Sequence, residues 1–149
     1  MTQKLTIGDQ APEFTAQDQQ GNSHSLSDYK GKWLALYFYP KDHTPGCIKE
    51  ACAIRDNYDD LQAKAKVIGV SADSVRSHAS FVEKYNLPFT LLADPEKKVL
   101  DAYGANGEVF AKRSTFIINP DGMIAKIYDK VSPDVHATEM ISDLEQLQG

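Results

Sequence analysis

The chain has 149 residues, of which 42% are hydrophobic and 25% are charged. This composition is typical of an ordinary globular domain, and it excludes a disordered or collagen-like chain. Lys and Arg number 16 against 21 Asp and Glu, for a net charge of −5, which makes nucleic acid and anionic membrane surfaces poor candidate partners. The longest apolar run covers residues 33–39, far fewer than the roughly 20 that a membrane-spanning helix needs. We therefore predict a single domain over residues 1–149 that binds neither nucleic acid nor membrane.

The N-terminal residues and the cysteine count point to one compartment. Residues 1–9 lack the charged segment followed by an apolar stretch that a secretion signal requires, so we expect a cytoplasmic protein. The two cysteines are too few for a disulfide-stapled scaffold or for a complete structural zinc site. In a reducing compartment, a bond between them is expected to be transient chemistry rather than architecture.

The first predicted elements are a hairpin, a buried strand and a helix. Residues 13–18 and 23–26 alternate around a turn, which predicts a small, peripheral N-terminal β-hairpin. Residues 32–39 are apolar on both faces, as in a central strand covered on both sides, and Pro40 ends this strand. A helix then starts at Pro45, because apolar residues follow at helical spacing on one inward face, namely Cys47, Ala51, Ile54, Tyr58, Leu61 and Ala65.

Strands and helices alternate through the middle of the chain. We predict strands at residues 67–71 and 89–92, with a helix over residues 74–86 between them. Asp94 is expected to cap a short helix that ends at Gly104. This alternation is typical of an α/β protein.

A hairpin and a last helix complete the chain. The hairpin covers residues 115–128 and turns at residues 120–122, where Pro, Asp and Gly follow one another. Residues 132–133, Ser and Pro, are expected to cap a final helix that can pack on the sheet through Val135, Met140, Ile141, Leu144 and Leu147. The complete order predicts a thioredoxin-like fold with a central mixed β-sheet flanked by helices.

The first predicted helix begins in a segment suited to a reactive sulfur. Thr44 occupies the N-cap, Pro45 the first helical position and Cys47 the third, so the Thr44 hydroxyl is expected to accept a hydrogen bond from the Cys47 N–H. Unpaired N–H groups and the positive end of the helix dipole favour the thiolate there, which is the form that attacks electrophiles. Gly46 has no side chain, so a substrate could approach the backbone amides closely.

Cys52 follows Cys47 in the same predicted helix, at a spacing that forbids a direct bond. Their Cα atoms would be roughly 8.7 Å apart, whereas a disulfide needs no more than about 7 Å. The first turns must therefore unwind if the two sulfurs join. The start of the helix would then have two states, helical and unwound. Oxidation would favour the unwound state and carry Cys47 out of its pocket toward a reducing partner.

Two motifs in this segment resemble a known family. Pro40-x-x-x-Thr44-x-x-Cys47 is similar to the peroxidatic signature of peroxiredoxins. Residues 44–52, Thr-Pro-Gly-Cys-Ile-Lys-Glu-Ala-Cys, resemble the peroxiredoxin Q group, also called bacterioferritin comigratory protein. The resemblance extends over essentially the whole chain and includes residues 8–14, 36–40, 67–74 and 113–122. Ile48 and Asn119 depart from the common pattern, and we expect them to alter packing rather than chemistry.

The resemblance implies a role for each residue of the site. Cys47 would be the peroxidatic nucleophile, Thr44 would hydrogen-bond the peroxide and the thiolate, and Pro40 would shield the sulfur. Arg113, just before a core strand, would supply a guanidinium that stabilises the thiolate and the charge on the peroxide oxygens. Glu50 would orient Arg113. The spacing in the sequence does not show that Arg113 lies near Cys47, so only the resemblance implies this contact.

The implied reaction is the reduction of hydrogen peroxide and organic hydroperoxides. The Cys47 thiolate attacks the O–O bond and becomes a sulfenic acid. Cys52 condenses with it to an intramolecular disulfide, and an external dithiol, thioredoxin in the first place, restores both thiols. The resemblance implies no metal, haem or flavin cofactor. We expect a monomer or a weak dimer.

Other interpretations are open for the same residues. Cys47 could be a buried core cysteine, Cys52 an incidental cysteine on a partly exposed helix face, and Arg113 a surface arginine. His43, Cys47 and Cys52 could be drawn as metal ligands, although the sequence offers no evident fourth ligand. The chain could also be a redox sensor, or a thiol–disulfide oxidoreductase without fast peroxide turnover. The latter usually needs a tighter Cys-x-x-Cys pair.

Two further groups of residues are expected to be structural. His24, His78 and His136 stand alone in polar segments, so we expect them to be solvated. The aromatic run at residues 37–39 is expected to form core and pocket wall rather than a platform for stacking a ligand.

Overall fold

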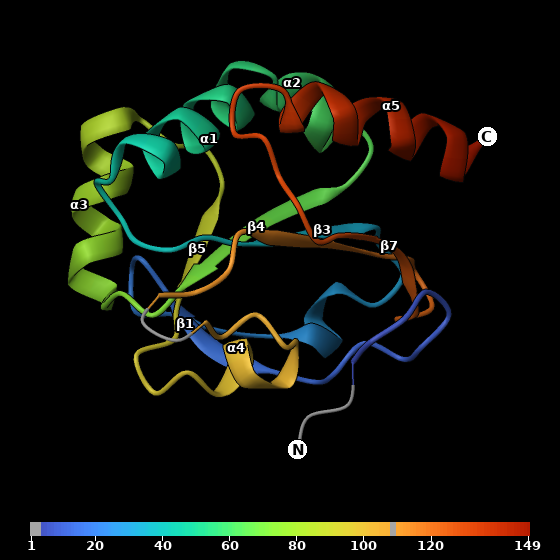
Figure 1. Cartoon of the computed structure of the whole chain (residues 1–149), viewed down its shortest axis with the longest axis horizontal. Coiled ribbons are helices and arrows are strands. Elements are labelled where there is room, and N and C mark those ends of the chain that lie inside the picture. The colour runs from blue at the N-terminus through green and yellow to red at the C-terminus, as the bar shows by residue number, and fades with distance from the viewer. Residues whose placement is uncertain (1–3, 108–109) are drawn as a thin grey trace.

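The computed structural model describes residues 4–107 and 110–149, which form one mixed sheet with helices on both faces (Figure 1). The strands are β1 (Thr15–Asp18), β2 (Ser23–Ser25), β3 (Leu34–Phe38), β4 (Lys66–Ser71), β5 (Thr90–Ala93), β6 (Ser114–Ile118) and β7 (Ile124–Tyr128). They lie in the order β2-β1-β5-β4-β3-β6-β7. β3 is parallel to β4 and β4 to β5, whereas the other neighbours are antiparallel. The predicted mixed sheet and the peripheral N-terminal hairpin are confirmed.

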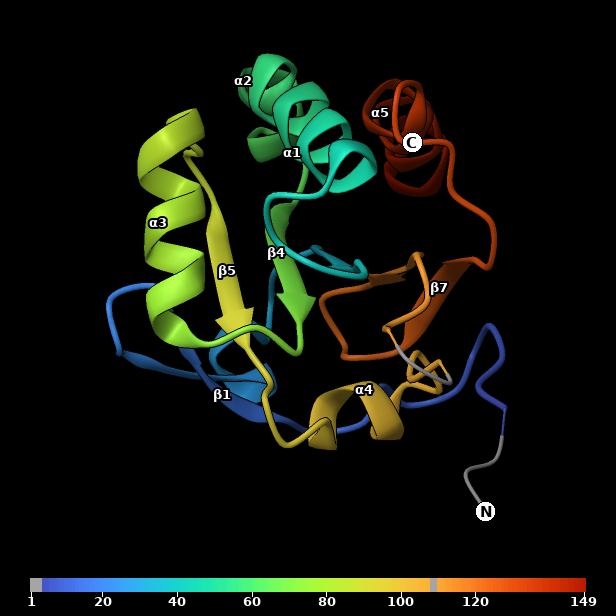
Figure 2. The ribbon, with the colours of Figure 1, turned by 60° about the vertical axis from the view of Figure 1, so that its left-hand side comes forward.

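The helices pack on the two faces of this sheet. They are α1 (Pro45–Asp56), α2 (Tyr58–Gln62), α3 (Val75–Tyr85), α4 (Lys98–Ala102) and α5 (His136–Gln148), with a short 3-10 helix, η1 (Leu26–Tyr29). α1, α2, α3 and α5 cover one face, and α4 lies on the other, as the turned view in Figure 2 also shows. Among the residues that the structure describes, no helix is long and apolar enough to cross a membrane.

The sheet separates two hydrophobic cores, and β3 contributes to both. All of its residues are buried. Because successive side chains of a strand point to opposite faces, Ala35 and Tyr37 enter the core beneath α1, α3 and α5. Leu34, Leu36 and Phe38 enter the core on the α4 side. The prediction of a central strand covered on both sides is confirmed.

The helix predicted from Pro45 to Ala65 is two helices. It breaks at Asn57, whose φ of −110° and ψ of 13° are not helical. The Asn57 side chain donates a hydrogen bond to the carbonyl of Ala53 at 2.8 Å, and such local competition for backbone groups is why Asn is a poor residue inside helices. The apolar stripe continues past the break because α2 restarts immediately and buries Leu61.

The short helix α4 begins later than predicted. Its N-cap is Lys97, which has a left-handed φ of 62°, rather than Asp94. Asp94 still serves the start of the helix, because its carboxylate accepts a hydrogen bond from the Leu100 N–H at 2.8 Å. Gly104 follows the helix with a φ of 65°, as predicted for a residue that must adopt the left-handed conformation after a helix end.

The C-terminal helix also begins later than its predicted cap. Residues 132–135 form a turn, in which the N–H groups of Val135 and His136 both donate to the Ser132 carbonyl, at 3.1 and 3.0 Å. Val135 and Leu147 are 51% and 38% exposed, so the prediction that they lie against the sheet is wrong. Val135 is the N-cap residue of α5 and Leu147 lies in its last turn.

Two of the three histidines expected in solvent are fully buried. His78 lies 2.7 Å from the carboxylate of Asp42, and His136 lies 2.8 Å from the hydroxyl of Thr115. Burial lowers the pKa of His136 and favours its neutral form. The third, His24, is partly buried. The prediction was wrong because the partners come from other elements of the fold, which the polar local sequence does not reveal.

Candidate active site

The loop from β3 to α1 positions the predicted nucleophile. β3 ends at Phe38, two residues before Pro40, and the chain turns at His43, whose φ of 63° is left-handed. Thr44 caps α1 with an extended backbone, φ −90° and ψ 149°, and Pro45 takes the first helical position. Cys47 then lies in the first turn with 2% of its surface exposed, on the inner face of the helix. The predicted helix start and the inward direction of Cys47 are confirmed.

The predicted capping hydrogen bond of Thr44 is wrong. Its hydroxyl donates to the carbonyl of Lys41 at 2.7 Å instead of accepting from the Cys47 N–H. In the described part of the chain no side chain caps this helix. The N–H groups of the first turn are thus left available to an anionic group near Cys47.

Arg113 reaches Cys47 through the pairing of two strands. It stands directly before β6, which lies antiparallel to β3 with Ser114 opposite Phe38. This register brings Arg113 to the end of β3, where the loop to α1 begins. Its Nη2 donates to Cys47 Sγ at 3.4 Å, and its Nη1 donates to Glu50 Oε1 at 2.6 Å. The fold therefore brings together three side chains that the resemblance associates with one site.

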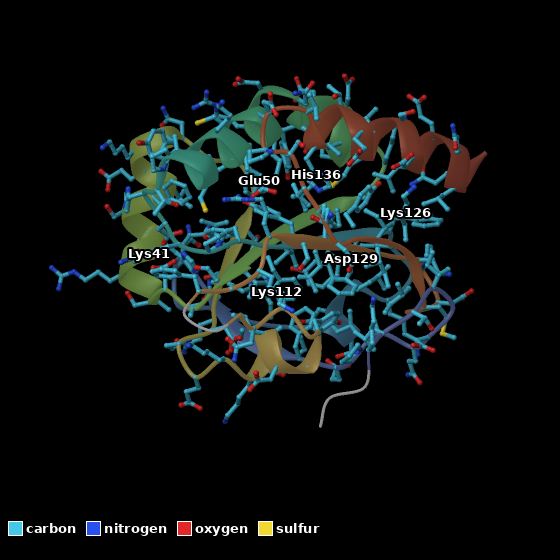
Figure 3. The ribbon with its side chains drawn as sticks, viewed as in Figure 1. Lys41, Glu50, Lys112, Lys126, Asp129 and His136 are labelled. Atoms are coloured by element: carbon cyan, nitrogen blue, oxygen red, sulfur yellow. The ribbon has the colours of Figure 1, made fainter. Side chains whose placement is uncertain are left out.

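Glu50 is a buried carboxyl that holds the guanidinium in place. Figure 3 shows it on the sheet-facing side of α1, and its side chain is 1% exposed. Burial raises the pKa of Glu50 to about 7, and the charge and hydrogen bond of Arg113 offset only part of this effect. Burial acts to lower the pKa of Arg113, but the negative charges of Glu50 and Cys47 outweigh it and raise that pKa. The guanidinium thus stays charged beside the sulfur.

Arg113 packs closely against Gly46. A Cβ atom at residue 46 would lie 3.0 Å from Arg113 Nη2, closer than most real contacts of a Cβ atom. The guanidinium therefore takes the space that a side chain would fill. The sequence suggested that the missing side chain admits a substrate to the backbone, and the structure adds a second reason for glycine here.

Cys52 lies farther along the same continuous helix and is only partly buried. In the described part of the chain both cysteines are free thiols. Because both belong to α1, the helix geometry argues that its turns must open before a bond between them can form.

One group of possible metal ligands occurs among the described residues, and it is not the trio of His43, Cys47 and Cys52. Its members are Asp42, Asp73 and His78, whose ligand atoms lie within 4.8 Å of one another. These atoms already accept or donate hydrogen bonds inside the protein, so the chemistry of the group fits a buried polar network. This network is not evident from the sequence, because its members come from separate elements.

Comparison with known proteins identifies the family. The model of the AhpC/TSA family matches residues 7–127. A Coxiella burnetii protein named putative peroxiredoxin bcp is 45% identical, in an alignment that covers 94% of this chain and 99% of that protein. A solved structure of a Xylella fastidiosa PrxQ mutant has a TM-score of 0.92 and 32% identity, with 99% of both chains covered. A structure of Xanthomonas campestris bacterioferritin comigratory protein, described for its alkyl peroxide reduction activity, has a TM-score of 0.86 and 30% identity, covering 91% of this chain and 92% of that one.

The fold is thus the thioredoxin-like fold of peroxiredoxins, as predicted. The chain belongs to the AhpC/TSA family and, within it, to the peroxiredoxins of the Q and bacterioferritin comigratory type. These are thiol-dependent peroxidases, which reduce peroxides and are recycled by thioredoxin-type reductants. The predicted class of enzyme is confirmed, whereas the roles of individual residues stay predictions.

Proposed function

We propose that this protein reduces hydroperoxides with the Cys47 thiolate as nucleophile and with Cys52 as the resolving thiol. The observation that carries the proposal is the hydrogen bond from Arg113 Nη2 to Cys47 Sγ at 3.4 Å. A guanidinium that donates to a sulfur stabilises its negative charge and so favours the thiolate. The first turn of α1 adds backbone N–H groups and the positive end of the helix dipole.

In the first step, the Cys47 sulfur forms a bond to one peroxide oxygen while the O–O bond breaks. The sulfur is oxidised to a sulfenic acid, the peroxide is reduced, and the departing alkoxide or hydroxide takes up a proton to give alcohol or water. Arg113 stabilises the charge that develops on these oxygens. The Thr44 hydroxyl donates to the loop, so its oxygen can accept the O–H of the peroxide. Pro40 shields the sulfur from water.

In the second step, the Cys52 thiol attacks the sulfur of the Cys47 sulfenic acid. The S–O bond breaks, an S–S bond forms and water leaves. α1 must unwind locally to let the two residues meet, since its regular geometry holds them too far apart. An external dithiol then reduces the disulfide by exchange and regenerates both thiols.

Hydrogen peroxide and organic hydroperoxides are the proposed substrates, and thioredoxin is the proposed reductant. The alkyl peroxide reduction activity described for the Xanthomonas campestris relative supports the organic substrates. A cytoplasmic location and a monomeric or weakly dimeric state stay predictions.

Mass spectrometry after one equivalent of peroxide tests the proposal. The parent protein should form an internal Cys47–Cys52 disulfide, and the Cys52→Ser variant should stop at a sulfenic or over-oxidised Cys47. A parent protein whose Cys47 does not react under these conditions would refute the proposal.

Turnover assays distinguish the alternatives. Fast peroxide consumption with thioredoxin, thioredoxin reductase and NADPH supports the enzyme. Oxidation without turnover would favour a redox sensor, and reduction of insulin disulfides without peroxide turnover would favour a thiol–disulfide oxidoreductase.

A further inference from the structure

A buried polar network underlies the loop that leads to Cys47, and the reaction steps above do not use it. Its centre is Asp42, which is 3% exposed although it lies in a loop. The network joins this loop to β4, α3 and β5 through side chains that come from distant parts of the sequence.

Three donors converge on the Asp42 carboxylate. The Tyr39 hydroxyl donates to Oδ1 at 2.6 Å, the Ser77 hydroxyl donates to Oδ2 at 2.8 Å, and His78 Nδ1 lies 2.7 Å from Oδ2. Burial by itself would raise the pKa of Asp42, but the hydrogen bonds from these three groups lower it below its ordinary value of 3.8. Asp42 is therefore an ionised acceptor inside the protein.

The His78 ring is held at both ends. Its Nε2 lies 2.9 Å from the carbonyl oxygen of Leu92 in β5. The carbonyl oxygen and the Asp42 carboxylate oxygen are both acceptors, so each ring nitrogen lies against one acceptor. A ring held between these two groups on the buried face of α3 fixes the position of that carboxylate relative to the sheet.

The backbone of the loop is fixed to the same platform. The Asp42 N–H donates to Asp73 Oδ2 at 2.9 Å, just after the end of β4. The ring of the next residue, His43, packs edge-on against Phe81 of α3, with the ring centroids 5.1 Å apart. The contacts thus hold the chain immediately before Thr44, which begins the helix of Cys47.

We propose that Asp42 is a positioning residue for Cys47. Asp42 anchors the loop on α3, so that the opening of α1 for disulfide formation begins after Thr44. The inference rests on the proposed function. In the first step, the anchored loop keeps Cys47 beside Arg113. In the second step, Cys47 sulfenic acid and the Cys52 thiol give a disulfide and water, and this step needs the opened helix. A weaker anchor should therefore slow the first step and spare the second.

Asp42→Asn is the variant that tests this proposal. It keeps the shape of the side chain, but an amide NH2 group replaces one of the two oxygens, so it cannot accept from all three donors. Asp18→Asn is the matched control. Asp18 lies in the edge hairpin 2.7 Å from His24, whose other ring nitrogen lies 2.8 Å from the Tyr29 hydroxyl. The control therefore removes a carboxylate from the same set of residue types, away from the loop.

The two steps are measured separately by rapid quench, alkylation and mass spectrometry. The first step is isolated in the Cys52→Ser background, and the second is the limiting rate of disulfide formation at saturating peroxide. We expect Asp42→Asn to slow the first step about tenfold, as a small displacement of a reacting group can, and to leave the second equally fast or faster. Asp18→Asn should change neither step.

The outcomes separate the inference from the proposed function. Unchanged rates in Asp42→Asn, or an equal slowing of both steps, would overturn the positioning role while leaving Cys47 as the nucleophile. Failure of the parent Cys47 to react would instead overturn the proposed function. If Asp42→Asn does not fold by circular dichroism, Ser77→Ala decides, since it removes one donor from a helix and should slow the first step alone by about threefold. No change in that variant would likewise overturn the positioning role.

Discussion

Helix α1 carries two cysteines, each near an arginine, in two different surroundings. Cys47 is 2% exposed and receives a hydrogen bond from Arg113. Cys52 is more exposed. Arg55, later in the same helix, donates its hydrogen bonds to groups other than Cys52. Arg55 Nε donates to Asp56 at 3.0 Å, and its Nη1 donates to the carbonyl of Tyr85 at 2.7 Å. Cysteine and arginine thus form a hydrogen-bonded pair at Cys47, whereas at Cys52 the arginine binds other groups.

The surroundings of the two cysteines differ in the position along the helix and in the direction of the arginine. The first turn of α1 offers unpaired N–H groups and the positive dipole end, and both effects fade within one turn. Arg113 is aimed at the sulfur by the β3–β6 register and by Glu50. Cys52 lies beyond the first turn, so it lacks the unpaired N–H groups and the positive dipole end.

The largest expected effect comes from exchanging each sulfur for oxygen. Cys47→Ser should lower peroxidase activity by at least about 10³-fold, because a serine hydroxyl is a far weaker nucleophile than a thiolate. Cys52→Ser should still consume one equivalent of peroxide rapidly and then stop in the thioredoxin-coupled assay. If the two variants behaved alike, the contrast between the two turns would be lost.

Replacing the two arginines by lysine should give the next largest difference. Arg113→Lys keeps a positive charge but loses the two-pronged donation to Cys47 and Glu50. We expect the rate constant of Cys47 oxidation, measured by stopped flow, to fall about 10²-fold. Arg55→Lys is the matched control and should stay within about twofold of the parent. Equal losses in both variants would show that the direction of Arg113 does not matter.

Glu50 should make stability depend on pH. Burial raises its pKa from 4.5 to about 7, so the folded state favours the neutral carboxyl. This contribution to stability is complete below pH 4.5 and is lost as the pH rises through 7. Glu50→Gln stays neutral, so its free energy of unfolding relative to the parent should rise over this interval by up to about 3 kcal/mol.

Urea titrations at a series of pH values measure this effect. Glu83→Gln on the exposed face of α3 is the control, and its stability relative to the parent should vary by less than about 0.5 kcal/mol. If the free energy of unfolding of Glu50→Gln relative to the parent did not change with pH, Glu50 would be ionised over the whole interval.

The smallest expected effect is that of Gly46→Ala. The added Cβ atom meets Arg113 Nη2 at 3.0 Å, so the guanidinium must shift by a few tenths of an ångström. We expect Cys47 oxidation to slow by about threefold to tenfold, with no loss of folded protein. Lys49→Ala adds a control on the exposed face of the same helix and should leave the rate unchanged. A rate in Gly46→Ala equal to that of the parent would show that Arg113 tolerates displacement.

Local patterns were sufficient for most of the fold. The double-sided apolar run of β3, the Pro-Asp-Gly turn before β7 and the Thr-Pro start of α1 act through neighbours in sequence, and each was predicted correctly. Two helix boundaries differ from the local pattern. Asn57 divides a continuous apolar stripe, since its side chain competes for the Ala53 carbonyl. The N-cap of α4 is Lys97 in a left-handed conformation, while the Asp94 carboxylate accepts from the Leu100 N–H.

Helical geometry depends on neighbours along the chain, so the helix of Cys47 and Cys52, its start and its inward face can be read from local residues. The same geometry predicts that the helix must open before the two sulfurs meet. The distant groups that surround the helix are set by the pairing and packing of other elements. Arg113 reaches Cys47 across the β3–β6 pairing, and Asp42 meets His78 beneath the loop. Burial of these groups also depends on the layers of the fold, and the pKa of Glu50 is raised mainly because other elements remove this carboxyl from water.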